Sequence, residues 1–309
     1  MKNFAAGKKL TSKEAARLLG ASEASVKRWA DGGLLPSEKT AGGHRRFRPE
    51  DVALFLREKA RGATATRRGG ANFSAATPSP EANDAPLPLT VESDEALVET
   101  LFGALASGDA EETSALLVKS YLQGKPPASI CDELLAAAMR RIGDLWHRGE
   151  LTIADEHLAT RAALDALQTL DKVVAEPEPY NLLAVCCGTE DDFHELPVRC
   201  AELILKHAGW EVLSLGAHTP FYALTDMVAR LHPALVCVAS TILGDLDRAV
   251  REYGELRRTA ARVGARVVLG GTGFADADIR RRLPAELHAD TFQQLLDFAD
   301  TLATTKRTE

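Results

Sequence analysis

The chain has 309 residues, a length that suits two or three domains. Hydrophobic residues make up 45% of the chain and aromatic residues only 6%, which favours helical and α/β layers over an all-β fold. The net charge of -7 is unevenly distributed, because residues 1–70 carry 16 Lys and Arg against 7 Asp and Glu, whereas the remaining residues carry 21 against 37. This asymmetry indicates a polyanion-binding module joined to an acidic body.

No apolar run reaches the length of a membrane span, and the N-terminus lacks the apolar segment of a signal peptide. We therefore expect a cytoplasmic protein with no membrane partner. The cysteines lie inside apolar segments, without the spacing of a zinc site or of a disulfide framework, so we expect reduced core thiols. They are Cys131, Cys186, Cys187, Cys200 and Cys237.

Residues 8–60 carry the start and stop signals of short helices. Thr11 and Glu14 have the spacing of a capping box, and Ser22 is placed to cap a second helix with the sequence EASVKRWAD. Two short helices joined by a tight turn form a helix-turn-helix. The following segment, LLPSEKTAGGHRRFR, predicts two short strands around a Gly-Gly tip, which is a wing, and Pro49 fits the first position of a third helix.

The segments VKRWADGGLLP and GGHRRFRPEDV resemble the winged helix-turn-helix of the MerR family over about fifty residues. The resemblance implies operator DNA as a partner, with the second helix at the base edges and the wing at phosphates or the minor groove. The candidate DNA-binding residues are Lys27, Arg28, His44, Arg45, Arg46 and Arg48. The alternative is a solvated basic surface without a ligand. The predicted core residues of this domain are Leu18, Leu19, Val26, Trp29, Phe47 and Phe55.

Two further segments follow this domain. Residues 61–92 are rich in Ala, Gly, Ser, Thr and Pro and predict a flexible linker. Residues 93–176 repeat Leu and Ala at helical spacing in four stretches, with breaks at or near Gly108, Gly124 and Gly149. Four helices with short connections predict a four-helix bundle.

The period changes in residues 179–305, where short apolar strands alternate with helices. The predicted strands are 181–187, 210–216, 234–240, 265–271 and 286–290, and the predicted helices cover about 197–208, 220–231, 246–263, 276–282 and 291–304. This alternation predicts a five-stranded parallel sheet covered on both faces. The fold class is therefore multidomain, with α and α/β parts.

A polar loop, CGTEDDFHELPVRC, follows the first of these strands. Its His194 stands beyond the strand's C-terminal end, where open α/β sheets bind ligands, and Asp192 two positions earlier suits a carboxylate that orients a metal-ligating imidazole. Ser240 and the pair Gly270-Gly271 follow the third and fourth strands at the same edge. The alternative for His194 is a surface histidine with no ligand. The other histidines after the bundle are predicted to be structural and without partners: His207, His218, His232 and His288.

This set resembles the Rossmann-like (flavodoxin-like) cobalamin-binding domain, in which Asp or Glu, any residue, and His precede a Ser element and a Gly-Gly element. The resemblance implies that His194 is the lower axial ligand of cobalt and displaces the cofactor's dimethylbenzimidazole base, whose tail then runs past Ser240 and Gly270-Gly271. The chain departs from the pattern at Pro197, where the family has Gly. Proline suits the first turn of the next helix, but it adds a ring where the tail must pass.

The bundle contains Trp146, nine residues, and then Glu156-His157, a spacing that resembles the CarH/LitR-like light-responsive regulators. The resemblance implies that this segment covers the upper face of the cofactor. Trp146 and Ile153 would form an apolar wall for a 5'-deoxyadenosyl group, and Glu156 and His157 would hydrogen-bond to it. His147 matches the histidine that takes the upper cobalt position after light has released that group.

The whole resemblance implies a light-responsive transcriptional repressor, not an enzyme, with adenosylcobalamin as chromophore. Methylcobalamin and hydroxocobalamin remain alternatives for the upper ligand. In the dark the family forms a homotetramer that binds operator DNA, and light breaks up the oligomer. Two other functions stay open: a MerR-type regulator that uses another ligand or none, and a cobalamin carrier for methyl transfer.

Overall fold

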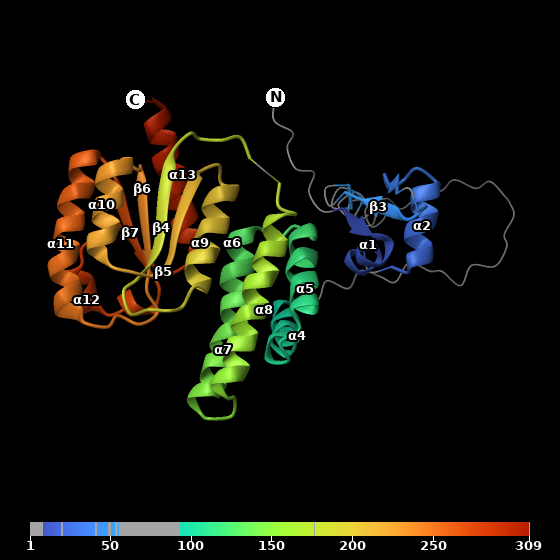
Figure 1. The fold of residues 1–309 in the computed structure, drawn as a ribbon, viewed down its shortest axis with the longest axis horizontal. Helices are drawn as coiled ribbons and strands as arrows, with labels where there is room; N and C mark the ends of the chain where they lie inside the picture. Colours follow the sequence, from blue (N-terminus) through green and yellow to red (C-terminus); the bar gives the residue numbers. More distant parts are fainter. Residues whose placement is uncertain are drawn as a thin grey trace, which may run out of the picture.

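A computed structural model of the chain describes residues 9–19, 21–40, 42–48, 51–52, 55, 93–175 and 177–308. These residues form a small N-terminal domain, a helical bundle and an α/β domain (Figure 1). The predicted linker, 61–92, and Pro49 lie outside the described residues. No helix in the part of the chain that the structure describes is long and apolar enough to cross a membrane.

The N-terminal domain has the predicted helix-turn-helix and wing. Its elements are β1 (Leu10–Thr11), α1 (Ser12–Leu18), α2 (Glu23–Asp31), β2 (Glu38–Lys39) and β3 (Arg45–Phe47). The capping box is confirmed, because the Thr11 N–H donates to Glu14 Oε2 at 2.6 Å and the Glu14 N–H donates to Thr11 Oγ1 at 3.2 Å. Ser22 caps α2 by accepting from the Ser25 N–H at 3.1 Å. The three strands pair antiparallel in the order β1-β3-β2, so the wing is confirmed.

The predicted core of this domain is also confirmed. Leu19, Val26 and Phe47 are buried, and the other predicted core residues pack partly buried against the core cluster: Leu18, Trp29 and Phe55. The Trp29 and Phe55 rings lie 5.0 Å apart. These apolar residues join α2 to the core of the domain and leave Lys27 and Arg28 exposed.

The bundle consists of α4 (Asp94–Ala106), α5 (Ala110–Leu122), α6 (Pro127–Ser129), a π-helical turn η1 (Ile130–Leu135), α7 (Ala136–His147) and α8 (Ile153–Asp171). Because α6, η1 and α7 are continuous, they form one of the four predicted helices. Gly108, Gly124 and Gly149 all have positive φ values and lie where helices end, as their spacing predicted. A capping box of Thr152 and Asp155 begins α8.

The α/β domain contains the five predicted strands in a parallel sheet of order β5-β4-β6-β7-β8. The strands are β4 (Leu183–Thr189), β5 (Glu211–Thr219), β6 (Leu235–Ala239), β7 (Arg266–Gly270) and β8 (Leu287–Ala289). The helices are α9 (Leu196–His207), α10 (Phe221–Leu231), α11 (Leu246–Val263), a 3-10 turn η2 (Thr272–Phe274), α12 (Ala277–Arg282) and α13 (Phe292–Thr308). The order reverses at β4, so the crevice beyond β4 and β6 is the place where such sheets bind ligands.

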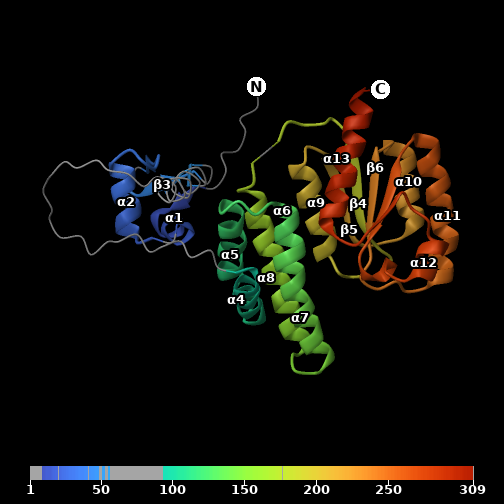
Figure 2. The same ribbon diagram turned by 180° about the vertical axis from the view of Figure 1, so that it is seen from behind.

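Helices cover both faces of this sheet, with α9 and α13 on one face and α10 and α11 on the other (Figures 1 and 2). Alternate residues of β4 therefore enter two cores. Val185 and Cys187 pack toward α10 and α11, whereas Ala184 and Cys186 pack toward α9 and α13. This double burial explains why the strands are apolar without alternation. All five cysteines of the chain are buried and free.

The bundle packs against the α9 and α13 face of the α/β domain (Figure 2). Asp132 of η1 caps α13 from the bundle, since its carboxylate accepts from the backbone N–H groups of Phe292 at 2.9 Å and Gln293 at 3.0 Å. At the end of α8, Asp171 accepts from Lys206 Nζ and His207 Nε2 of α9, both at 2.9 Å. Apolar side chains of α9 join the bundle core between these polar contacts.

Candidate functional site

The loop between β4 and α9 places His194 beside Asp192 at the point where the strand order reverses. The imidazole Nδ1 lies 2.6 Å from Oδ1 of Asp192. The carboxylate accepts, so the neutral imidazole carries its proton on Nδ1 and keeps the Nε2 lone pair for a metal. Asp192 is 3% exposed, whereas His194 is exposed, which leaves the ring accessible from the solvent side.

The Asp192 carboxylate is fixed by backbone donors from a second loop. Its Oδ2 accepts from the N–H groups of Thr241 at 2.5 Å and Ile242 at 3.3 Å, both beyond β6. Burial alone would raise the pKa of Asp192, but the hydrogen bonds from His194 and Thr241 outweigh it and lower that pKa. The hydrogen bond between His194 and Asp192 raises the pKa of His194 against the effect of burial.

Glu156 on α8 is the bundle residue that acts electrostatically on His194. Its negative charge contributes to the raised pKa of His194. Glu156 is half-buried, and its Oε1 accepts from Thr160 Oγ1 at 2.8 Å, one turn along the helix. His157 is exposed, and its Nε2 lies 3.7 Å from Glu156 Oε2. The N-terminal part of α8 therefore places Glu156 near His194, whereas no contact in the described residues joins His157 to His194.

Trp146 and His147 lie at the C-terminal end of α7, with ring centroids 4.8 Å apart at 85°. His147 Nδ1 lies 3.1 Å from the Gly143 carbonyl oxygen, which can only accept, so Nδ1 donates and Nε2 is left as a lone-pair donor. Trp146 is 41% exposed and Ile153 is 60% exposed, both high for large apolar residues. Within the described residues, no hydrogen bond, ion pair or ring contact joins Trp146 or His147 to His194.

Ser240 is buried beneath the loops that follow β6 and β7. Its hydroxyl accepts from Thr189 Oγ1 at 2.9 Å and donates to the Ile242 carbonyl at 3.1 Å. Gly271 has a φ of +99°, and a Cβ there would lie 2.3 Å from the Ser240 carbonyl oxygen. The predicted glycine thus allows two backbones to meet at this edge of the sheet. Gly270 lies against β8, where a Cβ would be 3.3 Å from the Ala289 carbonyl oxygen.

Sequence reasoning missed two members of this cluster. Thr189 is the last residue of β4, and Gly273 donates its N–H to the Ser240 carbonyl at 2.8 Å. A Cβ at Gly273 would lie 2.5 Å from Ser240 Oγ. The signal available in the sequence was a third glycine, two positions after Gly271. Pro197 lies in the first turn of α9, as predicted.

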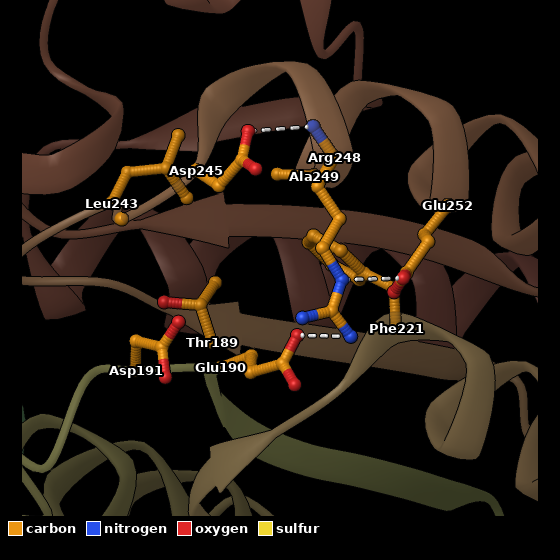
Figure 3. Close-up of a pocket in the computed structure, with 10 residues that line it drawn as sticks. Thr189, Glu190, Asp191, Phe221, Leu243, Asp245, Arg248, Ala249 and Glu252 are labelled. Carbon is orange, nitrogen blue, oxygen red and sulfur yellow. Dashed lines mark hydrogen bonds and ion pairs between the residues drawn. The ribbon is translucent and has the colours of Figure 1, made fainter.

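A pocket lies between the β4–α9 loop and α11 (Figure 3). Arg248 of α11 lies between two carboxylates. Its Nη2 is 2.9 Å from Glu190 Oε2, and its Nε is 2.9 Å from Glu252 Oε1. The pocket is lined by Thr189, Glu190, Asp191, Phe221, Leu243, Gly244, Asp245, Arg248, Ala249 and Glu252. The ion pair to Glu190 ties the loop to α11, so the loop is held on this side too.

The prediction that the four other histidines lack partners is wrong for three of them. His207 binds Asp171, and His288 Nε2 lies 2.9 Å from the Leu283 carbonyl oxygen. His218 accepts a hydrogen bond from the Asp191 N–H at 2.9 Å, next to the candidate site. The prediction failed because these partners come from other parts of the chain, between 5 and 36 residues away.

The candidate DNA-binding residues lie on α2 and the wing. Lys27 and Arg28 are exposed on α2, where Lys27 lies 3.6 Å from Glu23 and Arg28 donates to Ser25 Oγ at 3.4 Å. The Lys27–Glu23 pair is a surface ion pair, which contributes little stability. Both basic side chains of α2 are therefore exposed to solvent.

The wing presents the remaining candidates. His44 is exposed at the tip, and Arg46 is half-buried in β3. Arg48 lies 3.2 Å from Glu38, and Arg45 pairs with Asp31 at the end of α2. The ion pair of Arg45 fixes the wing to α2, which sequence reasoning did not anticipate.

Comparison with known proteins gives family matches in the N-terminal domain and in the helical bundle. A helix-turn-helix domain model matches residues 10–60, and a B12 binding domain model matches residues 97–171. The chain is 28% identical over 232 residues to the HTH-type transcriptional repressor CarH of Myxococcus xanthus, covering 72% of this chain and 75% of that protein. It is 30% identical over 145 residues to the repressor CarA of the same organism, covering 46% of this chain and 47% of that protein.

Corrinoid proteins also match part of the chain. Dimethylamine corrinoid protein 1 of Methanosarcina mazei is 25% identical over 187 residues, covering 60% of this chain and 86% of that protein. The structure of the Methanosarcina barkeri monomethylamine corrinoid protein superposes with a TM-score of 0.57 at 16% identity, covering 68% of this chain and all of that one. This similarity supports the bundle and parallel-sheet fold.

Proposed function

Because the chain is a CarH-like regulator with a helix-turn-helix domain and a B12-binding domain, we propose that it is a light-responsive repressor with adenosylcobalamin as its chromophore. The observation that carries the proposal is the Asp192–His194 pair at the strand-order reversal. Bound adenosylcobalamin supplies a cobalt–carbon bond that visible light breaks. The residues described above fit such a group, since a buried carboxylate orients an accessible imidazole and leaves Nε2 for cobalt.

The lower half of the site would hold the cofactor through its metal and its nucleotide tail. His194 is the proposed lower axial ligand, and Asp192 holds its ring in the required tautomer. Ser240, Gly270 and Gly271 are proposed to line the path of the tail. Pro197 suits the first turn of α9, at the position where the family has Gly.

The upper half would come from the bundle. Trp146 and Ile153 are exposed apolar side chains that suit the wall around an adenosyl group, and burying them would gain hydrophobic stabilisation. Glu156 and His157 suit its hydroxyl and base groups. His147, with Nε2 as the lone-pair donor, is the proposed second imidazole that binds cobalt once the adenosyl group has left.

We propose that this exchange controls DNA binding through the oligomer. In the dark, a tetramer presents several N-terminal domains, and linked domains bind repeated operator sites far more tightly than one domain can. Lys27 and Arg28 would contact base edges and phosphates, and His44, Arg45, Arg46 and Arg48 would contact the backbone or minor groove. After illumination, a shift of the bundle would separate the subunits and release the operator.

The test uses the full chain, purified in the dark with adenosylcobalamin and desalted. An operator is selected from a random double-stranded library in the dark, and its binding and the protein's mass in solution are then measured before and after green light. We expect a retained chromophore, and a large loss of DNA affinity and of mass after illumination. A retained chromophore with unchanged mass and DNA affinity would overturn the light switch. No retained chromophore would favour a regulator that uses another ligand.

A further inference from the structure

We infer that His218 is a positioning residue that holds the segment Asp191–Phe193 in place, so that His194 is presented to the cofactor in one orientation. The inference rests on the proposed function of His194 as the axial ligand. His218 lies near the end of β5, 24 residues after His194 in the chain. Its place beside the site results from a local irregularity in the sheet.

The irregularity is a bulge in β5. Cys187 of β4 pairs with Gly216, and Thr189 pairs with Thr219, so Ala217 and His218 together lie opposite Gly188. His218 adopts a left-handed conformation with a φ of +53°. A bulge of this kind redirects a side chain that regular pairing would place elsewhere. Here it directs the imidazole to the loop that follows the neighbouring strand.

His218 contacts each of the three residues that precede His194. Its imidazole Nδ1 accepts from the backbone N–H of Asp191 at 2.9 Å. The backbone N–H of His218 donates to the Asp192 carbonyl oxygen at 2.9 Å. The Phe193 ring stacks on the imidazole, with centroids 4.7 Å apart and planes 21° apart. One residue thus pairs with a backbone donor, a backbone acceptor and an aromatic ring of the segment Asp191–Phe193.

These contacts hold a conformation that the loop would not prefer by itself. Asp191 is also left-handed, with a φ of +63°. Left-handed backbone is uncommon even for Asp, and surrounding contacts help to fix it where it occurs. Without His218 the segment would populate several conformations, and the apparent affinity for a ligand falls with the fraction that is competent to bind. The carboxylate of Asp192 and the ring of His194 would both lose their fixed orientation.

His232 provides a matched comparison within the chain. It is also a left-handed histidine, with a φ of +50°. However, it ends α10 and precedes β6, so it lies at the N-terminal end of the strands, opposite the site. The two histidines therefore share residue type and backbone strain, and they differ in whether they contact the β4–α9 loop.

The experiment compares four variants with the wild-type full chain: His218→Ala, His218→Gly, His218→Asn and His232→Ala. Glycine removes the backbone strain but supplies no acceptor, whereas asparagine tolerates the left-handed region and supplies an acceptor oxygen. Two quantities are measured: hydrogen exchange of the loop amides in the cofactor-free proteins, and the affinity for hydroxocobalamin with its visible spectrum.

We expect the amides of residues 190–193 to exchange faster in His218→Ala and His218→Gly, and at nearly the wild-type rate in His218→Asn and His232→Ala. Affinity should fall about tenfold or more in the first two variants, the range typical of residues that orient a metal ligand. Unchanged loop exchange in His218→Gly would overturn the inference. Faster exchange with unchanged affinity would overturn the role toward the cofactor. If the wild type binds no cobalamin, the proposed function fails, and the exchange data still decide whether His218 holds the loop.

Discussion

His194 Nδ1 lies 2.6 Å from Oδ1 of Asp192, and the second oxygen of that carboxylate accepts from the Thr241 N–H in the loop after β6. One buried carboxylate therefore links the loops of two adjacent strands and fixes the imidazole between them. Replacing Asp192 by Asn should weaken cobalamin binding about 10- to 100-fold, because the amide offers no second carboxylate oxygen and does not favour the Nδ1–H tautomer.

Equilibrium titration with hydroxocobalamin measures this effect. Asp191→Asn is the matched control, since it changes the neighbouring exposed carboxylate, which lies 4.0 Å from His218 Nδ1 and makes no contact with His194 in the described structure. Equal affinities of Asp192→Asn and Asp191→Asn would remove Asp192 from the role of orienting the ligand.

His147→Ala should leave the dark state unchanged and alter the illuminated state. His147 is exposed at the end of α7 and bonds only to its own helix among the described residues, so its loss should cost little stability. The dark operator affinity should remain, whereas the visible spectrum after illumination should lack the signature of two imidazoles on cobalt. Arg148→Ala, the exposed neighbour, should behave as wild type. Identical spectra of His147→Ala and wild type after illumination would contradict the proposed exchange.

Asp171 gives a pH dependence to the contact between the bundle and α9. The hydrogen bond from His207, together with the ion pair to Lys206, lowers the pKa of Asp171 to about 2 against the effect of partial burial. A folded-state pKa below the usual value stabilises the fold fully above pH about 4, and this contribution is lost as the pH falls toward about 2. With allowance for solvent screening, Asp171→Asn should cost about 1 kcal/mol at pH 7.

Urea unfolding of Asp171→Asn at several pH values measures this contribution. The difference from wild type should shrink as the pH falls from about 4 to about 2, because the wild-type carboxylate is then protonated. Asp165→Asn, on the same helix with a half-buried carboxylate 3.4 Å from Arg161 Nε, should cost less than Asp171→Asn at pH 7. A difference for Asp171→Asn that stays constant down to pH 2 would contradict the assignment.

Gly271→Ala should destabilise the cofactor-free protein by about 3 kcal/mol, because it combines a left-handed backbone with a collision against the Ser240 carbonyl. Gly264→Ala separates these two causes. Gly264 has a φ of +75° with nothing within 4 Å of its ideal Cβ, so only strain of about 1 kcal/mol remains. Thermal unfolding of both variants gives the comparison, and equal losses would show that the contact with Ser240 imposes no extra constraint.

Local signals predicted most of the elements. The helix over 246–263 has the predicted bounds because Asp245 caps it and Gly264 ends it. The strands were predicted within three residues at their ends, since doubly buried strands leave short apolar runs between polar loops. Asp192, His194 and Ser240 lie in adjacent loops, as predicted, because the C-terminal ends of parallel strands meet on one side of the sheet.

Features that depend on distant partners were missed. The role of His218 follows from a register shift between β4 and β5, which no single segment encodes. Asp132 caps a helix 160 residues later in the chain, and the π-helical turn that carries it looks like ordinary helix in the sequence. Gly273 and Thr189 belong to this cluster through contacts with Ser240 from two other loops, which their own segments do not encode.

His194 is proposed to bind cobalt from below in place of the cofactor's own base. Electron paramagnetic resonance of the reduced Co(II) form, with ¹⁵N-histidine in the protein and unlabelled cobalamin, tests it directly. A bound ¹⁴N splits the cobalt lines into triplets and a bound ¹⁵N into doublets, so the account predicts doublets in the labelled wild type and their loss in His194→Ala. Triplets that persist in the labelled wild-type protein would show that dimethylbenzimidazole remains coordinated and would contradict the account.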